Sequence, residues 1–217
     1  MTGPHQKERI LAVGRPASEA AAAMVTLHGR GAPAEDILSL SAELGRPDFA
    51  YRAPQAAGYS WYPYSFLAPM HQNEPGLSSG LARIGEVLDL LESEGIPPER
   101  TVLLGFSQGA CLSLEHAARN ARRYGGVVGL SGGLIGPPGT PREYAGSLSG
   151  TPVFLGCSDR DPHIPLARVE ETAEVLQEMG GDVTKRIYPA MGHTVNEDEL
   201  EFVRRLMNDL VPWNAGA

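Results

Sequence analysis

Hydrophobic residues gather in seven short runs along the chain, and most of these runs are rich in aliphatic, β-branched residues. Several are continuous rather than alternating, which is typical of strands that a sheet buries on both faces. Gly, Pro or Asp residues bound them. We predict strands over residues 9–13, 24–28, 49–53, 101–106, 127–130, 153–157 and 185–188.

The stretches between these runs carry apolar residues three and four positions apart, the spacing of one face of a helix. This predicts helices over residues 77–94, 108–122, 166–176 and 196–210, and a weaker one over 35–44. In the second helix, Glu115, Arg119 and Arg122 fall on the polar side. Asn196, followed three residues later by Glu199, predicts a capping box at the start of the last helix.

Strands that alternate with helices predict a mostly parallel sheet covered on both faces. No Ser/Gly-rich linker, composition shift or internal repeat divides the chain. Because 217 residues also fit one hydrophobic core, we expect a single α/β domain over residues 1–217.

Composition and charge exclude several function classes. With 42% hydrophobic and 20% charged residues the chain is neither disordered nor a membrane protein, and it has no run of apolar residues long enough for a membrane span. A net charge of −8 without a basic run argues against nucleic acid as a partner. The N-terminus shows no secretory signal and there are two cysteines, so we expect a cytoplasmic protein without disulfides.

The pattern Gly-x-Ser-x-Gly occurs twice, around Ser107 and around Ser131. A serine nucleophile on such a motif needs a sharp turn from a strand into a helix, with small residues two positions away on each side. The first match follows a predicted strand and precedes a predicted helix. The second is followed by a Gly/Pro-rich stretch that cannot be helical. We therefore take Ser107 as the candidate nucleophile and Ser131 as the buried end of a strand.

A serine hydroxyl needs a base to remove its proton and an acid to orient that base. Downstream of Ser107, His116 lies within a predicted helix and His163 lies between two prolines. His193 lies in the loop between the last strand and the last helix, at the edge of the sheet where such sites form, and is the candidate base. For the acid, the residues leave Asp159 and Asp161 open, since both follow the strand over 153–157.

Four segments in this order resemble the phospholipase/carboxylesterase family of α/β-hydrolases, which includes the acyl-protein thioesterases. They are Leu27-His28-Gly29-Arg30-Gly31, Gly105-Phe106-Ser107-Gln108-Gly109-Ala110, Asp161-Pro162-His163-Ile164-Pro165 and Gly192-His193. Residues 60–63 and 73–77 are similar to the small bacterial carboxylesterase branch. The resemblance covers residues 24–210 and implies an α/β-hydrolase fold. With the seven predicted strands, and a chain too short to insert a large lid, we expect a mostly parallel sheet of about seven strands without a large lid domain.

The same resemblance implies roles for individual residues. In the family, the catalytic acid is the first residue of an Asp-x-x-Val/Ile-Pro run. Asp161 is the first residue of the matching run here, so the resemblance selects Asp161 over Asp159. The backbone amides of Arg30 and Gln108 are expected to form the oxyanion hole, with His28 shaping the loop. Ala32 departs from the family, which has an aspartate there.

The resemblance also places the loop after the third strand over the site. We therefore expect Trp61, Tyr62, Leu67 and Met70 to line a substrate pocket, and residues 134–150 are a candidate second wall.

Together these features predict a serine hydrolase that cleaves carboxylic esters of short to medium acyl chains through an acyl-enzyme, with no cofactor and no metal. An acyl-protein thioesterase or lysophospholipase is the alternative. A ligand-binding protein that keeps the fold with little turnover is an alternative of another class. The partner is a small-molecule ester or thioester, and the chain is a monomer or a homodimer. Arg30 is either a solvated surface cation or a selector for substrates that carry a carboxylate.

Overall fold

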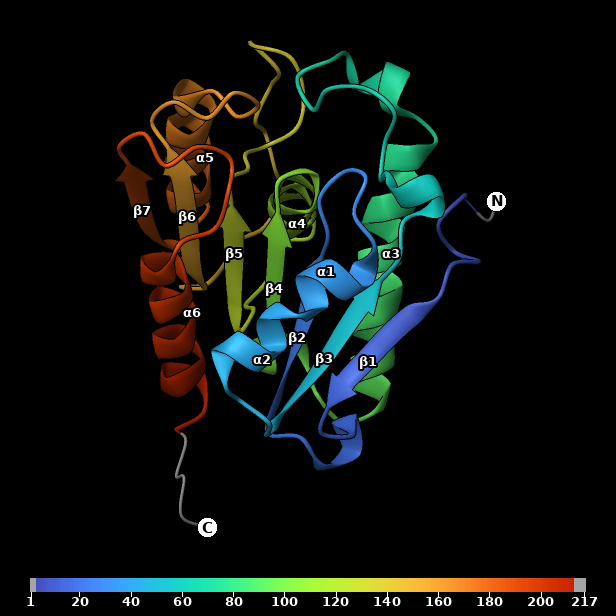
Figure 1. Cartoon of the computed structure of the whole chain (residues 1–217). Coiled ribbons are helices and arrows are strands. Elements are labelled where there is room, and N and C mark those ends of the chain that lie inside the picture. The colour runs from blue at the N-terminus through green and yellow to red at the C-terminus, as the bar shows by residue number, and fades with distance from the viewer. Residues whose placement is uncertain (1–2, 213–217) are drawn as a thin grey trace.

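The computed structural model describes residues 3–212, and its centre is a twisted sheet of seven strands (Figure 1). The strands lie in the order β1-β3-β2-β4-β5-β6-β7. β1 pairs antiparallel with β3, and every other neighbouring pair is parallel. Their bounds are β1 Ile10–Gly14, β2 Ala22–Leu27, β3 Phe49–Pro54, β4 Thr101–Phe106, β5 Gly126–Leu130, β6 Pro152–Ser158 and β7 Asp182–Tyr188. The expected mostly parallel sheet is confirmed.

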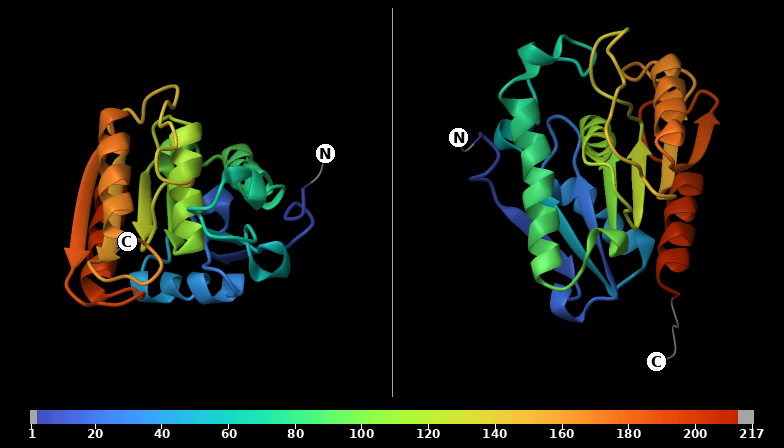
Figure 2. Two further views of the ribbon diagram at one scale, coloured as in Figure 1. Left: turned by 90° about the horizontal axis from the view of Figure 1, so that it is seen from above. Right: turned by 180° about the vertical axis from the view of Figure 1, so that it is seen from behind.

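Helices cover the sheet on both faces, as Figure 2 shows from above. The bounds are α1 Ala34–Leu38, α2 Leu40–Leu44, α3 Gly76–Ser93, α4 Gln108–Arg119, α5 Leu166–Glu178 and α6 Glu197–Leu210. Apolar side chains of α3, α4 and α5 belong to one core cluster, and those of α1, α2 and α6 belong to a second one on the opposite face. The alternating strand–helix pattern therefore predicts the layers correctly.

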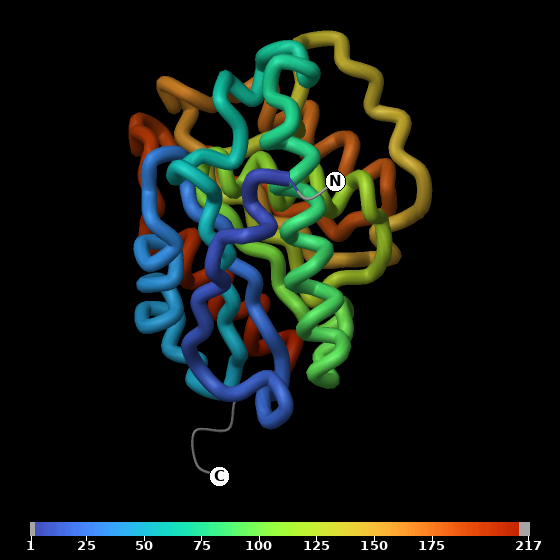
Figure 3. The backbone as a smooth tube through the Cα atoms, turned by 90° about the vertical axis from the view of Figure 1, so that its right-hand side faces the viewer, coloured from blue at the N-terminus to red at the C-terminus, as the bar shows by residue number. Residues whose placement is uncertain are grey.

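The N-terminal stretch before β1 lies along α3 (Figure 3). The side chain of Ser79 in α3 accepts from the backbone N–H of His5 and donates to Gln6, and Arg83 donates to the carbonyl of Glu8. These contacts attach the edge strand β1 and the segment before it to the helix layer.

Two helix predictions need correction. The predicted helix over 35–44 is two short helices, α1 and α2, which meet at Ser39. The predicted helix over 108–122 ends at Arg119, because Asn120 leaves the helical conformation and its side-chain amide donates to the carbonyl of His116. The capping box of α6 is present, with Asn196 and Glu199 each bonded to the other's backbone N–H.

Glu115 was expected on the polar side of its helix, but it is buried. Its carboxylate accepts hydrogen bonds from Arg119, the backbone N–H of Ile135 and the hydroxyl of Tyr144. A buried carboxylate is tolerated when such donors surround it. The long connection after β5 therefore covers a helix face that the periodicity assigns to solvent.

Candidate active site

Ser107 occupies a sharp turn between β4 and α4, at the carboxyl end of a central strand (Figure 1). Its φ of 55° and ψ of −117° are unusual for a residue with a side chain. A Cβ on Gly105 would lie 2.2 Å from the carbonyl oxygen of Gly109, and one on Gly109 would lie 2.1 Å from that of Leu27. Both glycines are thus required sterically, and the turn has the geometry of a nucleophile elbow.

The second Gly-x-Ser-x-Gly motif lies in the interior of the protein. Ser131 follows β5 directly and is fully buried. A Cβ on Gly132 would lie 2.4 Å from the Cβ of Ala110, so this glycine allows close packing against α4. Ser131 therefore belongs to the core, as the sequence suggests.

His193 lies in hydrogen-bond contact with both of its expected partners. Its Nε2 is 2.8 Å from the Oγ of Ser107, and its Nδ1 is 2.7 Å from the Oδ2 of Asp161. Because an ionised carboxylate only accepts hydrogen bonds, Nδ1 carries the proton and Nε2 is left to accept from the serine hydroxyl. The three side chains thus form one continuous chain of hydrogen bonds, although Ser107 and His193 are 86 residues apart in the sequence.

The surroundings of Asp161 favour its ionised form. Burial works to raise the pKa of this carboxyl, but the hydrogen bond with His193 and the backbone N–H groups of His163 and Ile164 outweigh it, so the pKa is lowered. A carboxylate that accepts from these donors, and from the thiol of Cys157, is fixed in place and keeps its negative charge beside the imidazole.

Asp159, the other acid that the sequence leaves open, does not contact His193 in this way. Its Oδ1 accepts from the backbone N–H of Ala190 at 2.7 Å, while the Oγ of Ser158 accepts from that of Gly192. Asp159 and Ser158 therefore hold the loop that carries His193, and the structure joins Asp161 to the imidazole.

The other histidines lie in distinct places. His116 is buried, bonded through Nδ1 to the carbonyl of Leu81, and burial lowers its pKa to about 4. His163 lines the same cavity as Ser107, with its ring edge-on to that of His193 at 4.8 Å between centroids. His28 is buried with Nδ1 on the carbonyl of Gly29 and Nε2 accepting from the N–H of Ala56, so it shapes the loop after β2 as expected.

The loop after β2 passes close to Ser107, because β2 pairs with β4 and Leu27 lies opposite Gly105. A Cβ on Gly29 would lie 3.5 Å from the Cβ of Ser107. The next residue is Arg30, and Gln108 is the first residue of α4, where backbone N–H groups have no partner within the helix. The two residues expected to form the oxyanion hole therefore flank the serine on adjoining segments.

Both of these residues also bind the loop over residues 60–66 through their side chains. The Gln108 amide accepts from the N–H of Trp61 at 2.9 Å and donates to the carbonyl of Tyr62 at 2.8 Å. The Arg30 guanidinium donates to the carbonyls of Pro63 at 2.8 Å and Tyr64 at 2.5 Å, and to the hydroxyl of Ser60.

These contacts change the interpretation of Arg30. Its terminal nitrogens donate to backbone carbonyls of the loop, so the side chain holds the loop in place. Arg30 is also exposed and lines the cavity that contains Ser107, and a role in selecting substrates with a carboxylate stays a prediction. On the far side of the loop, the buried Asn73 accepts from the N–H of Tyr64 and donates to the carbonyl of Ser65. The loop is therefore held from both sides.

An open cavity of about 640 Å³ contains Ser107 and His193. Of the four expected pocket residues, Tyr62 lines it. Trp61 does not, since it is fully buried between His5 and His28 with its indole N–H on the carbonyl of His28. Leu67 and Met70 pack against the core instead.

The residues that line this cavity include several that sequence reasoning missed. Phe106 occupies a variable position of the motif, and its ring packs on His193 at 5.0 Å between centroids. The others are Gly29, Ala32, Pro63, Tyr64, Ser65 and Phe66. Residues 134–150, the candidate second wall, do not line the cavity; Gly136 donates to the carbonyl of Phe66 and so supports the loop from behind. A lining position depends on which way a loop turns, and no periodic pattern signals that.

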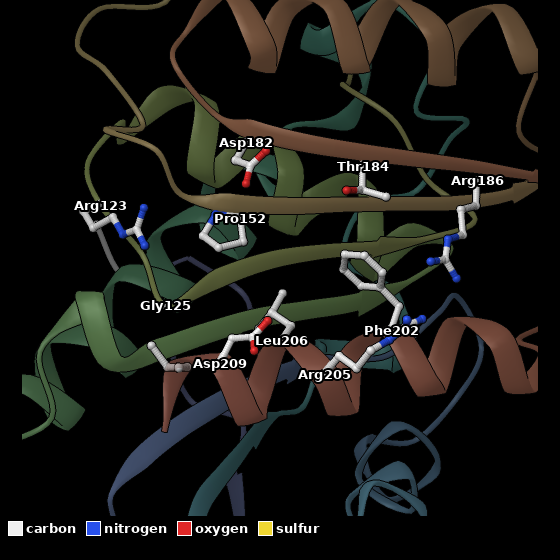
Figure 4. A pocket seen from close by; sticks show the side chains of 11 residues that line it. Arg123, Gly125, Pro152, Asp182, Thr184, Arg186, Phe202, Arg205, Leu206 and Asp209 are labelled. Atoms are coloured by element: carbon white, nitrogen blue, oxygen red, sulfur yellow. The ribbon is translucent and has the colours of Figure 1, made fainter. Parts of the chain in front are cut away.

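A separate hollow of about 530 Å³ lies between α6 and the sheet (Figure 4). Asp182, Thr184 and Arg186 reach it from β7, while Phe202 and Arg205 reach it from α6. Gly125 and Pro152, at the amino ends of β5 and β6, also line it, so this hollow is at the end of the sheet opposite to Ser107.

Within residues 3–212, no group of three or more His, Cys, Asp and Glu side chains is arranged to hold a metal ion. In the same part of the chain, every helix is too short or too polar to cross a membrane.

Comparisons with known proteins agree with this geometry. Residues 8–210 match the model of a family described as phospholipase/carboxylesterase. The crystal structure of a phospholipase/carboxylesterase from Dyadobacter fermentans is similar, with 44% identity, a TM-score of 0.90, and a match that covers 95% of this chain and 98% of that one.

More distant relatives carry thioesterase names. The acyl-protein thioesterase 1 of Gibberella zeae is 35% identical over 124 residues, which are 54% of this chain and 51% of that protein. The chain spans between half and three fifths of the length of the curated relatives that it matches. The acyl-protein thioesterase 2 of Zea mays, 21% identical with a TM-score of 0.72 over 94% of this chain and 99% of that one, shares the fold.

Proposed function

The chain belongs to the phospholipase/carboxylesterase family, as the motifs suggested, and from this premise we propose that it is a serine hydrolase of carboxylic esters with short to medium acyl chains. The observation that carries the proposal is the continuous hydrogen-bond chain from Ser107 through His193 to Asp161, at an open cavity. Residues 1–217 are proposed to act as one α/β-hydrolase domain.

In the proposed first step, the Oγ of Ser107 attacks the ester carbonyl while the Nε2 of His193 takes its proton. The bond between Oγ and the carbonyl carbon forms, and the carbonyl oxygen becomes negative. Asp161 stabilises the imidazolium and keeps it oriented. The backbone amides of Arg30 and Gln108 are proposed to donate to the negative oxygen. Loss of one such donor costs about 3 kcal/mol of transition-state stabilisation in enzymes where it has been measured.

Collapse of the tetrahedral intermediate breaks the bond to the leaving oxygen. The leaving oxygen keeps the electron pair of the broken bond, takes a proton from His193, and departs as an alcohol. Water, activated by the same imidazole, then attacks the acyl-enzyme and releases the acid with Ser107 regenerated. No step requires a cofactor.

A thioesterase or lysophospholipase activity is the second candidate, favoured by the acyl-protein thioesterase names of the Gibberella zeae and other fungal relatives. The chemistry at Ser107 would be the same, because a thiolate is also a competent leaving group. The length of the acyl chain that the site accepts is the property that distinguishes the candidates.

The test is a panel of p-nitrophenyl esters and acyl thioesters from acetyl to palmitoyl, with Ser107→Ala as the control. We expect the highest kcat/KM on esters with short to medium acyl chains, and no hydrolysis of any substrate by Ser107→Ala. Labelling of Ser107 by a fluorophosphonate without turnover of any substrate would instead favour a binding protein on this fold.

A further inference from the structure

A smaller cavity of about 220 Å³ adjoins the cavity that contains Ser107. The two share Gly29, Ala32 and Phe106 among their lining residues, so they meet beside the nucleophile. We call the smaller cavity the α1 groove, because it runs from this junction towards the helices after β2. Its other lining residues are His28, Asp36, Ile37, Leu40 and Val195.

The α1 groove lies on the imidazole side of Ser107. Val195 is two residues beyond His193 in the same loop, and the ring of Phe106, which lines both cavities, packs on the ring of His193. In Figure 1 this loop, between β7 and α6, runs in front of the sheet on the same face as α1. A group that enters the groove therefore passes the imidazole rather than the loop over residues 60–66.

Proton transfer decides which part of an ester takes this position. His193 must deliver its proton to the leaving oxygen as the bond between that oxygen and the acyl carbon breaks. The leaving oxygen thus lies near Nε2, and the alkyl group attached to it continues towards the groove. The acyl chain, attached to the carbonyl carbon, is left to the larger cavity.

The lining of the groove fits a neutral alkyl group. Ile37, Leu40, Phe106 and Val195 supply apolar walls, and neither Lys nor Arg is among the described lining residues. Asp36 adds a carboxylate, which disfavours an anionic ligand. The volume of about 220 Å³ corresponds to about seven molecules of liquid water at about 30 Å³ each, which is room for an alkyl chain of medium length.

We propose that the α1 groove binds the alkyl part of the leaving alcohol, so that the enzyme prefers esters of medium-chain primary alcohols. The inference rests on the proposed function, because it assumes that His193 protonates the leaving group. It assigns the alcohol and acyl parts of the substrate to two different cavities.

The test uses two substrate series with the full-length protein. The first is methyl, butyl, hexyl and octyl acetate, in which the alcohol grows; the second is methyl acetate to methyl octanoate, in which the acyl chain grows. We expect kcat/KM to rise about fourfold for each methylene added to the alcohol until the groove is full. Leu40→Trp in α2 and Val195→Trp in the loop between β7 and α6 should each fill the groove and flatten the alcohol series.

The readout is the ratio of octyl to methyl acetate within each variant, so that a general loss of activity cancels. Leu90→Trp is the matched control, since Leu90 is exposed on α3 away from both cavities, and it should keep the wild-type ratio. If the wild type cleaves methyl acetate but shows a flat alcohol series, the groove assignment is wrong and the hydrolase proposal stands. If the tryptophan variants change the acyl series instead, the groove belongs to the acyl chain. If no ester is cleaved, both proposals fail.

Discussion

Glu199 gives the sharpest prediction about stability. It lies in the first turn of α6 and is fully buried, with one carboxylate oxygen bonded to the backbone N–H of Asn196. The other oxygen, Oε1, has no hydrogen-bond partner among the described residues. It packs against Gly156, where an added Cβ would lie only 2.1 Å from it. Burial raises the pKa of Glu199 to about 7, and this outweighs the bond from Asn196.

The sign of the effect on stability follows from linkage. The pKa of Glu199 is raised on folding from 4.5 to about 7. Between these two pH values, the folded protein holds a proton that the unfolded chain has lost. The free energy of unfolding therefore falls by about 1.4 kcal/mol for each pH unit across this window, or roughly 3 kcal/mol in total, and is constant above it. The contribution is fully present at acidic pH and absent at pH 8.

Glu199→Gln should remove this dependence, because an amide of the same shape cannot ionise and can still accept from Asn196. The measurement is urea unfolding of both proteins from pH 4.5 to 8, followed by circular dichroism. We expect the variant to gain roughly 3 kcal/mol relative to the wild type as the pH rises. Glu201→Gln, at an exposed position of the same helix, should leave the profile unchanged. Parallel pH profiles for the wild type and Glu199→Gln would refute the argument.

Three further predictions concern the site. Asp161→Asn should lower kcat for p-nitrophenyl acetate about 10⁴-fold because it removes the charge that orients the imidazole, whereas Asp159→Asn should cost far less; the reverse order would show that the acid is misassigned. Gln108→Ala keeps the backbone amide but leaves the N–H of Trp61 unpaired and removes one of the two donors to the carbonyl of Tyr62, the other being the hydroxyl of Ser60. We expect kcat/KM to fall about tenfold and the Tm to drop, measured by steady-state kinetics and thermal melts; wild-type kinetics would show that the Gln108 side chain does not position the loop. Gly109→Ala should prevent folding, since the added Cβ would overlap the main chain of β2. Gly85→Ala is the control: its added Cβ would have its nearest contact at 3.9 Å, so this variant should fold. Soluble expression of the two variants is the measurement.

Much of the fold could be predicted from the sequence, because local patterns carry the information. All seven predicted strands lie within a few residues of the observed ones, and β4 has the predicted bounds. A run of apolar residues must be buried wherever it packs, and the capping box at Asn196 is formed by residues three positions apart. The choice of Ser107 over Ser131 also rests on local sterics, since only the first motif passes from a strand into a helix.

The parts that depend on contacts between distant segments were decided by the tertiary structure. Nothing in the sequence around Arg30 indicates that its guanidinium binds carbonyls some 33 residues away, or that Trp61 turns into the core while its neighbour Tyr62 lines the cavity. The burial of Glu115 and Glu199 likewise follows from a loop and a strand that pack over them. Periodicity predicts which face of a helix or strand is apolar and which is polar. Whether a polar side chain is buried depends on which distant segment of the chain packs against it.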